Sequence, residues 1–311
     1  MVPDILLLVF GLVLIVYGAD FLVDGASSIA RKSGVSEFVI GLTIVGMGTS
    51  APEMVVSVIG ALKGSAGIAI GNVVGSNVFN TLLILGLTAV ILPIAVTPEN
   101  RRRDIPVNIA VTALFLGLGF MDGRIDLWDG IIMLVCFCVY IWSCFKFDKG
   151  DSPQEEPLKN RTVPVAILMT LAGIAGLVFG GRLFVNSATA IAREIGASEK
   201  FIAITILAGG TSLPELATCI AAAVKKKGQL ALGNILGSNV FNILLIIGFA
   251  SVINPLSFDV INLTDAILLG ASSLLLLLCS FTGNKDRLDR WEGAVFCALW
   301  LAYMIYLIIN L

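Results

Sequence analysis

The chain has 311 residues, of which 57% are hydrophobic and 14% charged, with a mean hydropathy of +0.97 and a formal net charge of −2. No water-soluble domain can bury that much apolar surface, whereas a membrane-spanning helix needs about 20 apolar residues. The composition therefore excludes a soluble protein and predicts an all-α polytopic membrane protein whose surroundings are membrane lipid.

Apolar runs in chain order predict ten transmembrane helices. They are expected near residues 5–30, 36–61, 66–95, 105–121, 126–146, 164–192, 199–223, 229–254, 262–282 and 291–310. A polar stretch rich in acidic residues and prolines separates the fifth run from the sixth. We therefore expect a first five-helix repeat at 1–146, a cytoplasmic linker at 147–163 and a second five-helix repeat at 164–311.

Two polar motifs occur once in each half, and every repeated pair of residues is 162 positions apart. The first motif is Gly48-Thr49-Ser50-Ala51-Pro52-Glu53, which returns as Gly210-Thr211-Ser212-Leu213-Pro214-Glu215. The second is Gly71-Asn72-Val73-Val74-Gly75-Ser76-Asn77-Val78-Phe79-Asn80, which returns as Gly233-Asn234-Ile235-Leu236-Gly237-Ser238-Asn239-Val240-Phe241-Asn242. Because each copy has an odd number of spans, the second copy is expected to cross the membrane upside down.

The distribution of basic residues supports this count and predicts an orientation. With both termini outside, fifteen of the 20 Lys and Arg residues fall in inside loops, four fall in outside loops and Arg182 lies within a span. Basic residues are concentrated in cytoplasmic loops of membrane proteins. We therefore expect a multi-pass protein of the cell membrane, inner or plasma, with the N- and C-termini outside.

The first motif places a proline and a carboxylate inside an apolar helix. Pro52 has no N–H, so the Gly48 carbonyl loses its helical donor and the turn opens; Pro214 acts in the same way in the second half. Thr49, Ser50 and Glu53 are spaced so that they share one helix face. We therefore expect proline-broken core helices that line an enclosed polar cavity.

The second motif places a polar stripe on the following helix. Asn72, Ser76 and Asn80 are four residues apart, and Gly71 and Gly75 allow another helix to approach closely. The second copy has the same features at Asn234, Ser238, Asn242, Gly233 and Gly237. Either copy alone could be explained by a helix kink and interhelical hydrogen bonds, but duplication of all these positions favours a binding site.

The candidate ligands are all oxygens, which suit Ca²⁺, Mg²⁺ or Na⁺ better than thiophilic metals. Two carboxylates converging across a pseudo-two-fold axis would match one divalent or two monovalent cations. The candidate set comprises Glu53, Glu215, Thr49, Thr211, Ser50, Ser212, Ser76, Ser238, Asn80, Asn242, Asn72 and Asn234.

These motifs, present twice, resemble the α-repeats of the sodium/calcium exchanger family, within the cation/Ca²⁺ exchanger superfamily. The resemblance covers essentially the whole chain. It includes a short linker between the halves, which is similar to that of prokaryotic members of the family. It implies ten helices in two inverted halves, a central site shared by Ca²⁺ and Na⁺, and alternating access by sliding of the first helix of each half.

Carried over by motif position, the resemblance implies that Glu53, Glu215 and the Thr49 and Thr211 carbonyls hold Ca²⁺. It also implies that Ser50, Ser212, Ser76, Ser238 and Asn80 help to form Na⁺ sites. Some relatives, including potassium-dependent ones, carry Asp at the position of Asn242. The neutral amide argues against potassium co-transport.

Other functions are weighed against sodium/calcium exchange. A proton-coupled exchanger of Ca²⁺ or another divalent cation and a passive cation channel stay open, since ligand types alone do not identify the coupling ion. An intramembrane serine hydrolase is disfavoured because the chain contains no histidine to act as a base. We expect no enzyme activity, no cofactor, no nucleotide or nucleic-acid partner, and no requirement for an oligomer.

The repeat also contains a charge reversal. Asp20 and Arg182 occupy equivalent positions but carry opposite charges. One hypothesis is that they pair across the first and sixth helices in one access state; the alternative is two independent charges near the membrane surface.

Overall fold

The computed structural model describes residues 2–64, 66–147, 161–196, 208–259, 261–282 and 286–310. Within them, six helices are long and apolar enough to cross a membrane: Val2–Ser33, Gly67–Ile91, Asn100–Asp122, Leu127–Lys146, Val163–Glu194 and Gly228–Ile253. Glu37–Thr49 and Ala51–Leu62 meet the same criterion as a pair bent by 49°. The chain is therefore a multi-pass helical membrane protein with six or seven apolar spans in its described part.

The first half contains α1 (Val2–Ser33), α2 (Glu37–Ile40), α3 (Gly46–Thr49), α4 (Ala51–Leu62), α5 (Ala66–Val78), α6 (Leu85–Ile91), β1 (Ile94–Ala95), α7 (Ile105–Asp122), β2 (Arg124–Ile125) and α8 (Leu127–Lys146). The second contains α9 (Val163–Glu194), α11 (Ala208–Gly210), α12 (Leu213–Val224), α13 (Gly228–Val240), α14 (Gly248–Ile253), β3 (Leu256–Ser257), α15 (Leu263–Cys279), β4 (Arg287–Leu288) and α16 (Arg290–Asn310). Wider π-helical turns occupy Gly41–Val45, Phe79–Ile84, Asn100–Asp104 and Phe241–Ile247.

Helices therefore lie at or within all ten expected spans. The seventh expected span, 199–223, is described only from residue 208 onward, and most of the expected linker at 147–163 lies outside the described residues.

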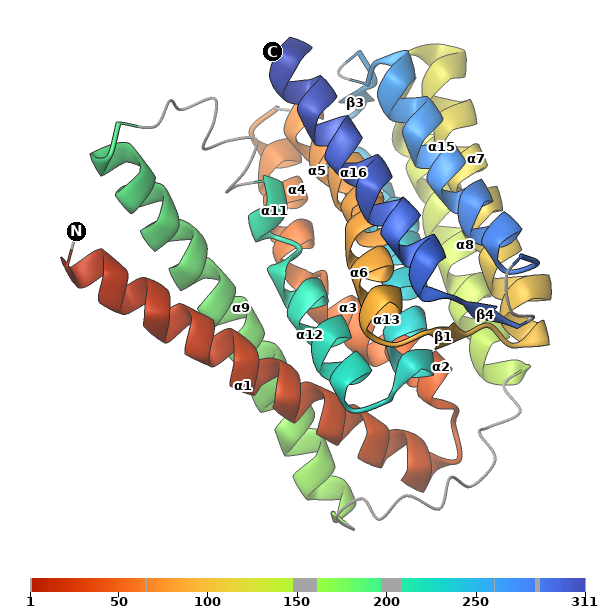
Figure 1. Cartoon of the computed structure of the whole chain (residues 1–311). Helices are drawn as coiled ribbons and strands as arrows, with labels where there is room; N and C mark the ends of the chain where they lie inside the picture. Colours follow the sequence, from red (N-terminus) through yellow and green to blue (C-terminus); the bar gives the residue numbers. More distant parts are fainter. Residues whose placement is uncertain are drawn as a thin grey trace.

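The two long helices α1 and α9 lie side by side and cross one flank of the remaining bundle (Figure 1). Their contact is close because glycines line it. A Cβ atom added at Gly11 would lie 2.8 Å from the Gly180 carbonyl oxygen, and one at Gly173 would lie 2.6 Å from the Leu22 nitrogen. Side chains at these positions would force the helices apart, so the glycines determine how α1 and α9 pack.

The bundle is built around α13, all of whose residues from Leu230 to Val240 are buried. By contrast, α1 exposes many large apolar side chains, including Leu6, Phe10 and Val13. A helix that is apolar and exposed is stable only where lipid replaces water. The burial pattern thus places α13 in the centre of the protein and one face of α1 against lipid.

Two very short antiparallel sheets join the halves. Strand β1 pairs with β4 through Ile94 and Leu288, and β2 pairs with β3 through Ile125 and Leu256. The first sheet lies at the lower end of the bundle and the second at its upper end (Figure 1). Ile94 and Leu256 are 162 positions apart, so equivalent segments of the two halves lie at opposite ends of the molecule.

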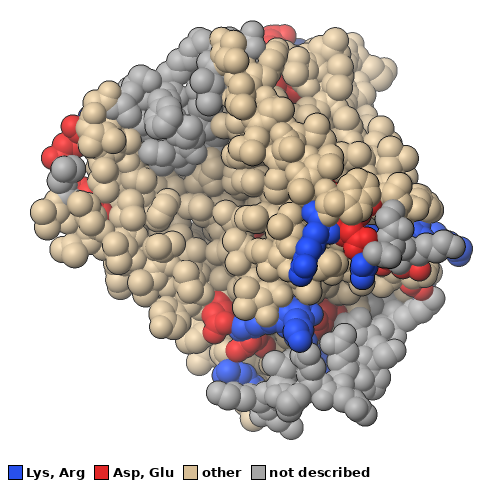
Figure 2. Space-filling model, viewed as in Figure 1, with Lys and Arg blue, Asp and Glu red and all other residues tan. Residues whose placement is uncertain are grey.

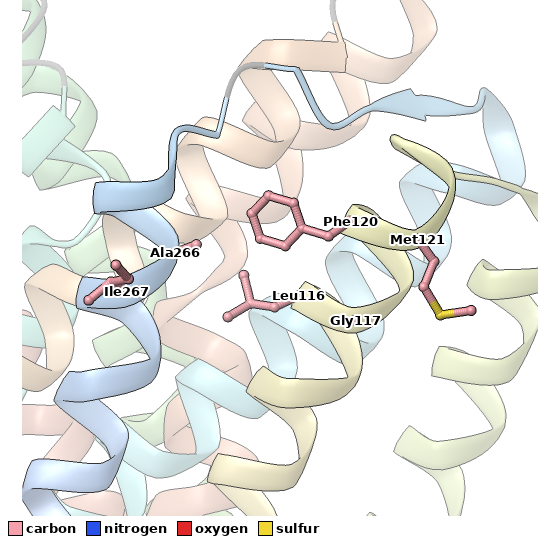
Figure 3. Close-up of a pocket in the computed structure, with 6 residues that line it drawn as sticks. All are labelled: Leu116, Gly117, Phe120, Met121, Ala266 and Ile267. Atoms are coloured by element: carbon pink, nitrogen blue, oxygen red, sulfur yellow. The ribbon is translucent and has the colours of Figure 1, made fainter.

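The face of the molecule seen in Figure 2 has a broad uncharged region, with Lys and Arg in the lower half of the view. An apolar hollow between α7 and α15 is lined by Leu116, Gly117, Phe120, Met121, Ala266 and Ile267 (Figure 3). None of these side chains carries an oxygen, so the hollow provides no side-chain ligand for a cation.

Candidate cation site

Both repeated Gly-Thr-Ser-x-Pro-Glu motifs interrupt a helix at the serine. Ser50 has φ −79° and ψ 10°, and Ser212 has φ −88° and ψ 8°, so the backbone turns at equivalent points in the two halves. A new helix starts immediately afterwards, with the proline near its beginning and the glutamate in its first turn. The free N–H groups at a helix start favour a negative charge, so each carboxylate lies where its own helix stabilises it.

The two glutamates are fully buried and each is held by a serine from the other half. Ser50 donates to Glu215 Oε1 at 2.8 Å, and Ser212 donates to Glu53 Oε1 at 3.1 Å. Ser76 and Ser238, from the following helices of each half, also donate to these Oε1 atoms, at 3.5 and 3.4 Å. The halves therefore meet through crossed serine–glutamate contacts in the middle of the apolar bundle.

Four buried oxygens around this centre accept no hydrogen bond from the described residues. They are Glu53 Oε2, Glu215 Oε2, Asn80 Oδ1 and Asn242 Oδ1, two symmetry-related pairs. A buried oxygen without a donor is costly, so native proteins rarely keep one without a ligand or water to satisfy it. Four such acceptors, two of them on carboxylates, are oxygens of the kind that cations bind.

Asn72 and Asn234 use their oxygens differently. Thr49 Oγ1 donates to Asn234 Oδ1 at 3.2 Å, and Thr211 Oγ1 donates to Asn72 Oδ1 at 3.5 Å. Their amide nitrogens contact Ser57 Oγ and Cys219 Sγ at equivalent positions. Both amides are thus engaged by protein atoms and hold the threonines of the opposite half in place.

Two further asparagines, Asn77 and Asn239, bond to the side chains that carry orphan oxygens. Asn242 Nδ2 donates to Asn77 Oδ1 at 2.9 Å, and Asn80 Nδ2 donates to Asn239 Oδ1 at 3.2 Å. They were not among the residues predicted from the sequence. Each lies one residue after a serine of the polar stripe and therefore does not fit the four-residue spacing that defines the stripe. The available signal was their identity in both copies of the motif.

Asn80 and Asn242 both lie in π-helical turns, Phe79–Ile84 and Phe241–Ile247. Such turns are uncommon and recur at functional sites because they re-aim side chains within a helix.

A cavity of about 600 Å³ leads to one side of the site. Residues of α4 and α5, including Pro52, Asn72 and Ser76, face Arg182 and Asn186 of α9 across it, and Thr211 contributes to its wall. The equivalent contact, between α1 and α12, is packed. Asp20 of α1 pairs there with Lys225 of α12. The Asp20–Arg182 pair hypothesised from the sequence is thus replaced in this conformation by pairing of Asp20 with Lys225, while Arg182 lines the cavity.

The family model described as sodium/calcium exchanger protein matches residues 4–146 and 165–309. The chain belongs to the sodium/calcium exchanger family. This agrees with the resemblance found in the repeated motifs and with the oxygen-lined site between two similar halves.

Among similar members of the family is the sodium/calcium exchanger MaX1 of Methanosarcina acetivorans, 33% identical over 98% of each chain. The inner membrane protein YrbG of Escherichia coli is 36% identical, over 97% of this chain and 96% of that one. Among solved structures, the sodium-calcium exchanger NCX_Mj superposes with a TM-score of 0.87 at 32% identity, covering 98% of both chains. The family likeness therefore extends over nearly the full length of these relatives.

Proposed function

We propose that this exchanger family member is a secondary active antiporter that exchanges Ca²⁺ for Na⁺ across a cell membrane. The observation that carries the proposal is the set of four unsatisfied, buried oxygens on Glu53, Glu215, Asn80 and Asn242. They combine two negative charges with neutral acceptors, the ligand chemistry of Ca²⁺ and Na⁺.

The proposed ligand set keeps ten of the twelve predicted residues, and the geometry gives the other two, Asn72 and Asn234, a different role. Glu53 and Glu215 supply the charge that one Ca²⁺ or two Na⁺ neutralise. Oxygens of Thr49, Thr211, Ser50, Ser212, Ser76, Ser238, Asn80 and Asn242 complete the coordination. Asn72 and Asn234 act on the threonines to which they are hydrogen-bonded.

The proposed architecture has ten transmembrane helices in two inverted repeats, at 1–146 and 164–311, with both termini outside. The two small sheets support it, since equivalent strands lie at opposite ends of the bundle. The gathering of basic residues at one end supports the orientation.

Alternating access at the shared site is supported by an asymmetry between the halves. The cavity separates α9 from α4, whereas the equivalent helices α1 and α12 are in contact. Sliding of the α1–α9 pair over the bundle would exchange these two arrangements and move access from one end to the other.

A flux assay in liposomes tests the coupling ion. We expect an outward Na⁺ gradient to drive ⁴⁵Ca²⁺ uptake by the purified chain, because Na⁺ and Ca²⁺ compete for the same oxygens. Uptake should be unchanged when K⁺ is replaced by an inert cation, since Asn242 provides no charge for K⁺. A proton gradient without Na⁺ should give little uptake.

Each alternative has its own signature in the same assay. Uptake driven by protons alone would identify a proton-coupled exchanger, and an absolute requirement for K⁺ would overturn the role given to Asn242. Uptake that needs no counter-ion inside the vesicle would identify a channel.

A further inference from the structure

We propose that Asn77 and Asn239 are positioning residues that fix which atom of Asn242 and Asn80 faces the cation. The inference rests on the proposed function and deepens it. An asparagine amide can turn either its oxygen or its NH₂ group toward a site, and only the oxygen binds a cation. The structure supplies the bonds that select the oxygen.

For Asn242 the selection follows from one backbone atom. Asn77 Nδ2 donates to the backbone carbonyl of Asn239 at 3.1 Å, and a carbonyl can only accept. The amide of Asn77 is therefore fixed with Oδ1 on its other side, where it accepts from Asn242 Nδ2. Asn242 Oδ1 must then point away from Asn77, and it is one of the unsatisfied oxygens.

The other half uses a related arrangement. Asn239 Nδ2 donates to Thr81 Oγ1 at 2.8 Å, and Asn239 Oδ1 accepts from Asn80 Nδ2 at 3.2 Å. Asn80 Oδ1 is in turn left without a donor among the described residues. All four asparagines are buried, at 3% exposure or less, so water does not compete for these bonds. Each half thus orients a ligand that belongs to the other half.

Calcium binding to the purified protein, measured by calorimetry in detergent, tests this arrangement. Asn77→Ala should weaken Ca²⁺ binding about tenfold or more, the usual cost of losing a residue that orients a metal ligand. An Asp side chain at position 242 has two oxygens and no NH₂ group, so it presents an oxygen to the cation whichever way its carboxylate is turned. In an Asn242→Asp background the Asn77→Ala penalty should largely disappear, whereas in an Asn80→Asp background it should persist.

The crossed control is Asn239→Ala, whose penalty should be removed by Asn80→Asp and not by Asn242→Asp. A purely structural role would give equal penalties in all backgrounds, and that result would overturn the proposal. If the Asn77→Ala protein does not fold, the Asn239→Ala variants test the same positioning role. Wild-type protein that binds neither Ca²⁺ nor Na⁺ would instead refute the proposed function.

A separate observation carries a second proposal, at the contact between α1 and α12. Lys225, at the C-terminal end of α12, lies 2.5 Å from Asp20 Oδ1 and 2.6 Å from Asp24 Oδ1, and it donates to the Asp20 carbonyl. Arg161 lies 3.6 Å from Asp24 Oδ2. We infer that this ionic clasp holds α1 against α12, and thereby favours the conformation in which the cavity beside α9 is open.

The repeat shows that the clasp is one-sided. The equivalents of Lys225, Asp20 and Asp24 are Lys63, Arg182 and Asn186, each 162 positions away. Two cations and an amide cannot form the same clasp. Arg182 and Asn186 line the cavity, so among the described residues the cavity lies on the side that lacks this clasp. The charge asymmetry therefore biases access to the site, given the alternating access proposed above.

Hydrogen exchange of α1 provides a test that does not depend on transport. Lys225→Gln should accelerate amide exchange in residues 18–33 about fivefold or more, because α1 loses its attachment to α12. The matched control Lys63→Gln, at the equivalent position, should leave exchange unchanged. Asp20→Lys combined with Lys225→Glu should restore protection.

Transport provides the second readout. If the clasp disfavours the other access state, its removal should strengthen apparent Ca²⁺ affinity on the side of the clasp and leave the cavity side little changed. Unchanged amide hydrogen exchange in Lys225→Gln, or an equal increase in Lys63→Gln, would overturn the clasp. Absence of Na⁺/Ca²⁺ exchange by the wild-type protein would count against the proposed function only.

Discussion

Replacing Glu53 or Glu215 with Gln should lower Na⁺-driven Ca²⁺ uptake by about a hundredfold or more, while the protein still inserts and folds. Each substitution keeps the side-chain volume and an acceptor for its serine, but removes one of the two carboxylate charges at the site. A charged side chain at the bilayer centre raises the free energy of the protein by about 3 kcal/mol when nothing neutralises it. If cation binding recovers that amount, loss of one charge lowers the affinity by roughly a hundredfold. The measurement is ⁴⁵Ca²⁺ flux in liposomes at matched protein density.

Asp122→Asn is the matched control, because it neutralises an exposed carboxylate at the end of α7, away from the repeated motifs. It should retain wild-type flux. Wild-type exchange in either glutamate variant, with folding verified by size-exclusion chromatography, would remove these carboxylates from the proposed site.

Gly237→Ala should destabilise the protein strongly, whereas Gly117→Ala in α7 should not. A Cβ at Gly237 would lie 2.1 Å from the Leu42 carbonyl oxygen, with two more backbone atoms of Leu42 at 2.6 Å. At Gly117, no atom of the described residues lies within 4 Å of the added Cβ. Overpacking against backbone costs about 3 kcal/mol, so we expect the apparent melting temperature of Gly237→Ala to fall by roughly 5–10 °C.

The measurement is thermal unfolding in detergent, followed by fluorescence or by loss of the monodisperse peak. The pair is informative because both glycines lie within helices and differ in what the described residues pack against them. Equal losses for both variants would contradict the close packing of Gly237 against Leu42 as the cause.

Much of the site was predictable because its residues are close in sequence. The motif spacing places Glu53 in the first turn of the helix that follows Ser50, and spacing of four places Ser76 and Asn80 on one face. The proline explains why the helix turns at Ser50. The exchanger family was likewise recognisable from the motifs, because both copies keep every oxygen-bearing side chain.

The contacts between the halves were not predictable in this way. Pairing of Asp20 with Arg182 was one of two hypotheses drawn from their equivalent positions, and in the structure Asp20 pairs with Lys225. Equivalence in sequence is a poor guide to contact here, since equivalent strands of the two halves lie at opposite ends of the molecule. Asn77 and Asn239 were missed for a related reason, because their partners belong to the opposite half.

The sequence by itself determined the membrane environment, the duplication and the chemical type of the candidate ligands, because composition, the repeated motifs and the spacing within one helix fix all three. Only the tertiary structure decided that Ser50 and Ser212 contact the glutamates of the other half, which four oxygens are left unsatisfied, and that the cavity lies beside α9. Those features depend on how two similar halves are placed against each other. The repeat of 162 residues shows which residues are equivalent, but it does not show which residues of the two halves are in contact.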